Sequence, residues 1–153
     1  MRPPFRAATI EDVPAIVAMR DRLNVLELTG CPHAAIEPLT AEQFAARWGP
    51  TFGHEDYHWV IFEDEGRAAG FGLIYLTLPV TEPPHAFLHW AYLDPTFRRH
   101  GVGRSLVDHL LGWARRRGAD HVELQFIDGN VPAEHFWRAM GFQPFARKCV
   151  RYL

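Results

Sequence analysis

A stretch near the middle of the chain, residues 93–105, most constrains what this sequence can fold into. It follows an apolar segment at 86–93, whose composition predicts a strand buried on both faces. After a turn at 94–96, residues 101–117 carry apolar side chains at helical spacing. The connection between strand and helix is short and rich in arginine and glycine. This order places a helix N-terminus beside the end of a central strand.

The remaining segments predict a mixture of strands and helices, which favours an α/β or α+β sheet domain. Arg20 continues the apolar helical face that Val13, Ile16 and Val17 begin. Strands are expected at 5–8, 58–63, 68–78, 86–93, 121–127 and 147–153, and helices at 13–28, 40–48, 101–117 and 131–140, the first of them ending at 29–32.

Composition excludes several classes of protein. The chain has 153 residues, of which 48% are hydrophobic, so it can bury a core, and disorder, collagen and coiled coil are excluded. Its net charge of −2 argues against nucleic acid or an anionic membrane as a partner. No apolar run approaches the length of a membrane span, and no signal peptide is apparent. Cys31 and Cys149 make no disulfide framework, so a reducing, cytoplasmic setting is expected.

The arginine- and glycine-rich connection predicts an anion site. The first N–H groups of a helix lack intrahelical partners, and the helix dipole makes this end attractive to phosphate. Gly101 and Gly103 would allow close approach to the backbone, and Arg98, Arg99 and Arg104 could add charge-assisted hydrogen bonds. Two such glycines also occur before helices that bind nothing. The spacing is neither a Walker loop nor the three-glycine dinucleotide motif.

The wider pattern is similar to that of a known family. Arg98-x-x-Gly101-x-Gly103 after an apolar strand resembles motif A of the GNAT N-acetyltransferase superfamily, whose Gln/Arg-x-x-Gly-x-Gly/Ala consensus holds the pyrophosphate of acetyl-coenzyme A. Residues 130–142 resemble the family's Asn-x-x-Ala-x-x-Phe-Tyr-x-x-x-Gly-Phe segment. Residues 6–13 resemble its usual start.

This resemblance implies one GNAT domain over residues 1–153. Its sheet would be mixed, with about six or seven strands and about four flanking helices, splayed between the fourth and fifth strands. It also implies acetyl-CoA as cosubstrate and a primary amine as acceptor. Direct attack in a ternary complex is preferred over an acyl-enzyme, because no cysteine lies beside the motif. The acceptor would be a small molecule or a peptide, and a homodimer is compatible with the family. The alternative is a non-catalytic acyl-CoA-binding or sensing module with the same fold.

The resemblance also assigns residues to the coenzyme. Asn130 would lie beside the coenzyme arm, although asparagine equally suits an ordinary helix N-cap at this position. The full set is the backbone of Ala91 and Leu93 for the pantetheine arm, Arg98, Arg99, His100, Gly101, Val102, Gly103, Arg104 and Ser105 for the pyrophosphate, and Asn130.

His89 is the candidate general base, and His85 at the strand entrance is a weaker candidate. His89 is the one polar side chain in the middle of strand 86–93, and strand alternation places it on one face with Phe87, Ala91 and Leu93. An ordinary histidine pKa of about 6.5 suits a base at neutral pH. The competing interpretation is a core histidine with a satisfied hydrogen bond.

No general acid can be assigned. Trp137 stands where many family members have a tyrosine, and an indole N–H is a donor but not an acid. Tyr92, Tyr152, Cys149 or water could serve instead, or the thiolate could leave unprotonated.

Other polar residues carry weaker signals. His54 and His58 have helical metal spacing, but no carboxylate or cysteine completes a ligand set, so no metal is expected. Glu27, Glu37 and Glu82 could meet a cationic amine, within segments 23–38 and 78–85 that shape the acceptor site in the family.

Overall fold

The computed structural model describes residues 4–28 and 38–153. The predicted end of the first helix at 29–32, together with Cys31 and Glu37, lies outside the described residues. Among the helices that are described, none is long and apolar enough to cross a membrane.

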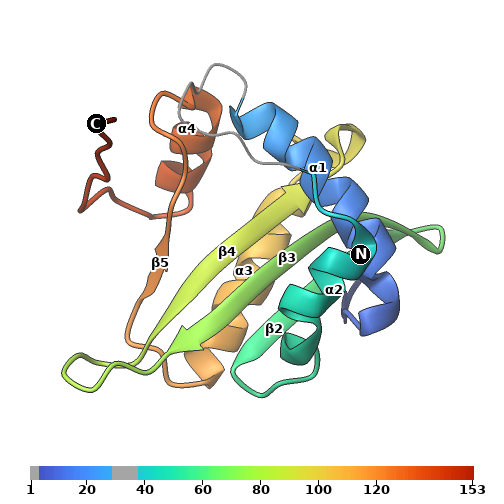
Figure 1. The fold of residues 1–153 in the computed structure, drawn as a ribbon, viewed down its shortest axis with the longest axis horizontal. Helices are drawn as coiled ribbons and strands as arrows, with labels where there is room; N and C mark the ends of the chain where they lie inside the picture. Colours follow the sequence, from blue (N-terminus) through green and yellow to red (C-terminus); the bar gives the residue numbers. More distant parts are fainter. Residues whose placement is uncertain (1–3, 29–37) are drawn as a thin grey trace.

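A five-stranded mixed sheet forms the centre of the described structure (Figure 1). Its spatial order follows the chain: the first four strands are antiparallel neighbours, and the fifth joins the fourth in parallel. A parallel step needs a long crossover, which residues 94–121 supply. The strands are β1 (Phe5–Ala7), β2 (Tyr57–Asp64), β3 (Arg67–Thr77), β4 (His85–Leu93) and β5 (Val122–Leu124).

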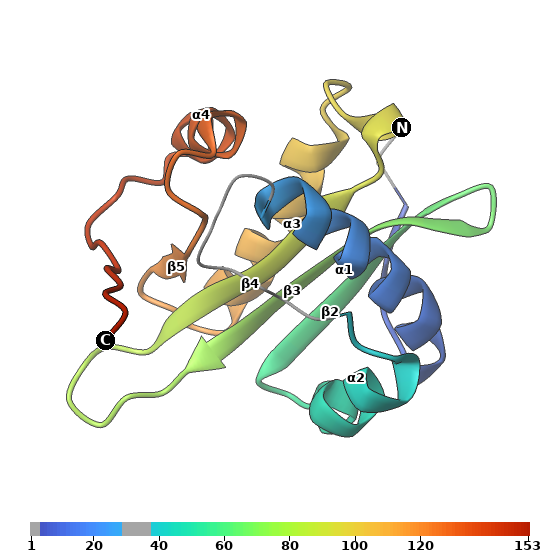
Figure 2. The ribbon, with the colours of Figure 1, turned by 45° about the horizontal axis from the view of Figure 1, so that its top comes forward.

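Helices cover both faces of this sheet. α1 (Val13–Leu28) and α2 (Ala41–Trp48) lie on one face and α3 (Val102–Arg116) on the other, whereas α4 (Val131–Ala139) follows β5 (Figure 2). The described residues also form three short 3-10 turns, η1 (Ile10–Asp12), η2 (Gly49–Thr51) and η3 (Pro95–Phe97). The mixed α+β class is confirmed, and the helix bounds agree with the predicted ones to within one residue.

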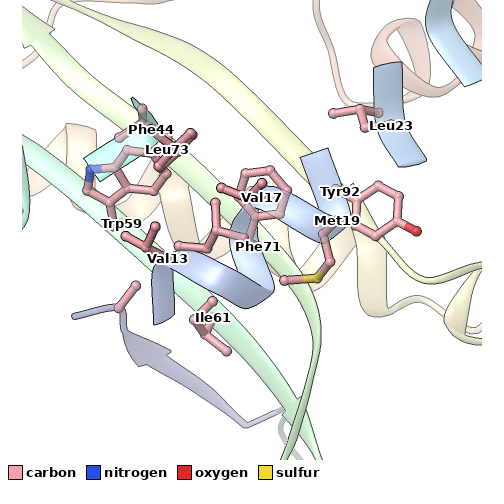
Figure 3. Packing of buried hydrophobic residues seen from close by; sticks show 12 residues of the cluster. Val13, Val17, Met19, Leu23, Phe44, Trp59, Ile61, Phe71, Leu73 and Tyr92 are labelled. Carbon is pink, nitrogen blue, oxygen red and sulfur yellow. The ribbon is translucent and has the colours of Figure 1, made fainter. Parts of the chain in front are cut away.

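Each face of the sheet has its own apolar core. Under α1 and α2, Val17 and Phe44 pack with Phe71 of β3 (Figure 3). Under α3, the buried side chains of Leu106 and Leu110 pack against the opposite face. The two cores fix β3 and β4 between helical layers, and this positions the end of β4 that leads into the arginine-rich loop.

The register between β3 and β4 shifts by one residue near the middle of β4. Leu73 is opposite Trp90 and Ile74 is opposite Leu88, so His89 is the extra residue of a β-bulge. A bulge interrupts the alternation of side chains between the two faces of the sheet. Residues with odd numbers therefore point to one face before the bulge and to the other face after it.

The predicted face of His89 is therefore wrong in part. His89 does contact Phe87, with ring centroids 5.9 Å apart. Ala91 and Leu93, however, pack with the clusters on the α3 side of the sheet. The prediction assigned every second residue of the strand to the same face. It failed beyond His89 because nothing in the sequence indicates the extra residue that the bulge adds.

Two predictions at the C-terminal end are also wrong. β5 covers only Val122–Leu124 instead of 121–127, and residues 147–153 form no strand. The described sheet thus has five strands instead of six or seven. The tail carries several apolar residues, but these alone supply no pairing partner. β5 pairs over three residues only and then diverges, and Phe145 and Tyr152 are exposed.

Candidate active site

The end of β4 has an edge that no described strand covers. β4 and β5 pair only where residues 86–88 lie opposite Val122–Leu124. β4 then continues to Leu93, while β5 bends away toward α4 (Figure 1). On this edge, beyond Leu88, no strand among the described residues pairs with β4. An extended ligand could therefore lie along the backbone near Ala91 and Leu93, as an added strand does.

The loop after β4 turns the chain sharply into α3. Arg99 and Gly101 both have left-handed backbone conformations, with φ of 62° and 80°. Gly101 caps the helix, and its carbonyl accepts the N–H of Ser105 at 3.0 Å. The N–H groups of the residues between them have no intrahelical acceptor, and the positive end of the helix dipole lies behind them.

Space and charge are both available at this helix N-terminus. Within the described part of the chain, a Cβ on Gly101 would meet nothing within 4 Å, and one on Gly103 would touch only the Phe136 ring at 3.8 Å. Arg99 and Arg104 are exposed and form no ion pair within the described ranges. The arrangement can hold a doubly charged anion between the backbone donors and the guanidinium groups.

Arg98 differs from its neighbours. Its Nε donates a hydrogen bond to the carbonyl oxygen of Leu93 at 3.0 Å, and its guanidinium lies 5.9 Å from the centre of the Tyr92 ring. The side chain folds back onto the end of β4, so Arg98 ties the loop to the strand. His100 is exposed and Ser105 is half-buried at the same helix end.

A buried carboxylate that sequence reasoning missed fixes the end of β4. Asp94 is 8% exposed and accepts hydrogen bonds from the Tyr92 hydroxyl at 3.0 Å and from Arg22 and Arg67 at 3.3 Å each. Two cations balance its charge, which makes its burial tolerable. The only signal in the sequence was the Asp-Pro turn. Tyr92 is therefore buried, and its hydroxyl proton is donated to Asp94. This argues against Tyr92 as a general acid.

The His89 side chain sits among aromatic rings on the α1 and α2 side of the sheet. Its ring centroid lies 4.3 Å from that of Trp90 and 5.1 Å from that of Trp48. Its Nδ1 is buried and has no hydrogen-bond partner among residues 4–28 and 38–153. Burial, and then the positive charges of Arg20 and Arg47, lower the pKa of His89 to about 4. The ordinary pKa expected from sequence is therefore wrong, and the ring is neutral at neutral pH.

Arg20 lies close to His89, and the sequence did not indicate that it would contribute to the site. It is 7% exposed, and its guanidinium lies 5.9 Å from the Trp90 ring. Its one ion pair within the described residues is with Asp21 at 3.4 Å, and its Nε has no partner. The available signal was an arginine on an otherwise apolar helical face. Beside this region lies an open hollow of about 280 Å³, lined by Arg47, Trp48, Thr51, Tyr57 and Tyr75.

The second family-like block forms α4 and its cap. The Asn130 side chain accepts a hydrogen bond from the N–H of Ala133 at 3.2 Å, so it is the N-cap of α4. Trp137 is half-buried and packs against Phe136 and Phe142, with ring centroids 4.9 and 5.5 Å away. Of the other acid candidates, Tyr152 and Cys149 are exposed in the tail.

The fold and this site together define a class of protein: a mixed α+β fold with diverging parallel strands beside an open, arginine-flanked helix N-terminus. A model of the acetyltransferase (GNAT) family matches residues 23–142. The chain belongs to this family.

Individual proteins that resemble this chain are consistent with membership of the GNAT family. Mycothiol acetyltransferase of Beutenbergia cavernae is 30% identical over 114 residues, which cover 74% of this chain but only 37% of that protein. The [ribosomal protein bS18]-alanine N-acetyltransferase of Escherichia coli K12 is 28% identical over 127 residues, covering 78% of this chain and 79% of the relative. Among solved structures, a BH1408 protein variant from Bacillus halodurans superposes with a TM-score of 0.80 at 21% identity, over 98% of this chain and 99% of the other. This last likeness shows the fold alone.

Proposed function

We propose that this chain transfers an acetyl group from acetyl-CoA to a primary amine. The observation that carries the proposal is the divergence of β4 and β5 directly beside a helix N-terminus that Gly101 holds open. Relatives named as acetyltransferases of mycothiol and of a ribosomal protein's alanine support an amine acceptor that is a small molecule or a peptide.

In this proposal the coenzyme lies along the uncovered edge of β4. The pantetheine arm pairs with the backbone of Ala91 and Leu93, and the pyrophosphate is held at residues 98–105. There the first-turn N–H groups of α3 and the uncommitted side chains of Arg99 and Arg104 supply the positive potential. Asn130 faces the arm from the start of α4 while it caps that helix.

The chemistry is direct attack in a ternary complex. The amine nitrogen uses its lone pair to form a bond to the thioester carbon, the C–S bond breaks, and the electron pair leaves with sulfur as the coenzyme A thiolate. The nitrogen must lose a proton along the way. A backbone N–H near residues 91–93 is the proposed donor to the oxygen that becomes negative during attack.

His89 is the proposed base. With a pKa of about 4 it is a weak base, but it is in the neutral form that can accept a proton. Bond formation to the carbonyl carbon makes the attacking nitrogen far more acidic than a free ammonium, so a weak base suffices at that stage. If His89 acts in this way, its own contribution to the acidic limb of the pH–rate profile, apart from that of the amine substrate, falls near pH 4 in place of pH 6.5.

No side chain is proposed as general acid. Trp137 cannot donate a proton at relevant pH. A thiol pKa of about 8.5 makes the thiolate a tolerable leaving group, so protonation by water after C–S cleavage is sufficient.

We further propose that the protein is cytoplasmic, has no nucleic-acid partner and is compatible with a homodimer. We also propose that no metal takes part in the reaction.

The proposed reaction forms no covalent acyl-enzyme. Initial rates measured while both substrates vary should therefore give intersecting lines in double-reciprocal plots. Parallel lines would show a ping-pong route through an acyl-enzyme. The Cys31→Ala, Cys149→Ala double variant should keep its turnover, and loss of activity in the folded variant would contradict direct attack.

A further inference from the structure

Three side chains converge at the end of β4 opposite the proposed coenzyme loop. His85 is the first residue of β4, while His121 and Glu123 flank the first residue of β5. One ligand atom from each lies within 4.8 Å of the other two. Neither the sequence spacing nor the proposed reaction accounts for this group.

The distances fit a tetrahedral ion. Glu123 Oε1 lies 3.0 Å from His121 Nε2 and 3.9 Å from His85 Nε2. Bonds of about 2.1 Å at tetrahedral angles separate neighbouring ligand atoms by about 3.4 Å. The two observed distances bracket that value. The rings of His85 and His121 are stacked 12° from parallel with centroids 4.9 Å apart, so one ring must turn for both Nε2 lone pairs to meet at one ion.

Each imidazole is oriented through its other nitrogen. His121 Nδ1 lies 3.0 Å from Asp120 Oδ2, and His85 Nδ1 lies 3.4 Å from the carbonyl oxygen of Pro83. Both neighbours are acceptors, so each can take the hydrogen bond of a proton on Nδ1. In the structure His121 Nε2 is hydrogen-bonded to Glu123 Oε1, and an ion that binds to the Nε2 lone pairs replaces this hydrogen bond. This is the usual outer support of metal-binding histidines.

The backbone beneath the group is held by two hydrogen bonds. The N–H of Ala86 donates to the carbonyl oxygen of His121 at 3.0 Å, and the N–H of Asp120 donates to that of Pro84 at 2.8 Å. The parallel pairing of β4 and β5 therefore presets the ligand separation. His85 is buried whereas His121 is exposed, so an ion can enter from solvent and keep a water as its fourth ligand.

We propose that His85, His121 and Glu123 form a zinc site that clasps the closed end of the diverging β4 and β5 strands. Two imidazoles and one carboxylate are donors that suit Zn²⁺ better than Mg²⁺ or Ca²⁺. The site joins the strand that carries His89 to the segment that leads to α4. It lies at the far end of β4 from the arginine-rich loop, and it stands independently of the proposed transfer reaction.

The test is calorimetric titration of Zn²⁺ into the full chain in a chelator-washed Cys31→Ser, Cys149→Ser background, so that thiols do not compete. One ion should bind per chain. Affinity should fall at least tenfold in His121→Ala and in Glu123→Gln, and about tenfold in Asp120→Asn, which removes only the outer support. The control is His135→Ala, an exposed histidine on α4, which should keep the parent affinity.

Thermal unfolding gives a second readout. Added Zn²⁺ should raise the Tm of the parent and of His135→Ala, but not that of His121→Ala or Glu123→Gln, whose Tm without metal should stay near that of the parent. Absence of binding to the parent, or equal affinity in all variants, would overturn the proposal, since equal affinity means adventitious binding elsewhere on the surface.

Discussion

Replacing Gly101 by alanine tests the loop that the proposed reaction needs most. Gly101 has φ of 80°, and a Cβ there would meet no atom within 4 Å. The substitution therefore introduces no clash within the protein. It adds only the strain of a left-handed alanine, about 1–2 kcal/mol. In a domain of this size, that lowers Tm by roughly 2–8 °C.

The effect on coenzyme binding should be separate from this loss of stability. If the loop keeps its conformation, the new methyl group projects into the space where the pyrophosphate is proposed to approach. If the loop relaxes, the first-turn N–H groups of α3 turn away from that space. In either case coenzyme A affinity should fall at least tenfold, which corresponds to about 1.4 kcal/mol.

Gly118 provides a matched control at the other end of the same helix. Its φ is 81°, and a Cβ there would also meet nothing within 4 Å. Gly118→Ala should therefore lose about as much Tm as Gly101→Ala while its coenzyme A affinity stays unchanged. Thermal unfolding and calorimetric titration with coenzyme A measure both quantities. Equal coenzyme A affinity in the two variants would refute the placement of the pyrophosphate at this loop.

Three further predictions concern stability and titration. Burial lowers the pKa of His58 to about 4, and the positive charges of His109 and Arg116 add to this effect. As pH falls, His58 is therefore protonated in the unfolded chain at a higher pH than in the folded chain. The stability that His58 contributes is present above pH 6.5 and is lost as pH falls toward 4, on the order of 1–2 kcal/mol after allowance for solvent screening. Urea unfolding at pH 7 and pH 4.5 should show that the unfolding free energy falls less in His58→Gln than in the parent protein. Arg20→Gln should raise the pKa of His89 by removing a neighbouring positive charge, and an unchanged NMR titration of that ring would count against it. Leu110→Ala empties a fully buried position and should lower the unfolding free energy by about 2–5 kcal/mol, measured by urea.

Local patterns predicted much of the fold. The apolar spacing of residues 101–117 gave α3, because an amphipathic helix is encoded in neighbouring turns. The turn between β2 and β3 and the cap at Asn130 were likewise local. The glycines at 101 and 103 predicted an open helix N-terminus, and the structure places one there with Gly101 in the left-handed conformation.

Features that depend on pairing between distant segments could not be predicted. The bulge at His89 arises from the register of β4 against β3, and it changed which residues share a face with that ring. Burial and the charges of Arg20 and Arg47, from other parts of the chain, lower its pKa. His85 and His121 meet because two strands pair in parallel across a long crossover. The sequence also predicts a strand at 147–153, but its formation depends on a neighbouring edge that β5 does not extend far enough to provide.

The measurement that tests the central claim most directly is release of free thiol from acetyl-CoA in the presence of a panel of primary amines, including amino acids, aminoglycosides and peptides with free N-termini. Mass spectrometry of the amine completes the assay. Acetyl transfer predicts thiol release that depends on an amine, with one acetylated amine formed for each thiol. Tight binding of acetyl-CoA without amine-dependent thiol release for any acceptor would contradict the account and favour a non-catalytic acyl-CoA-binding module.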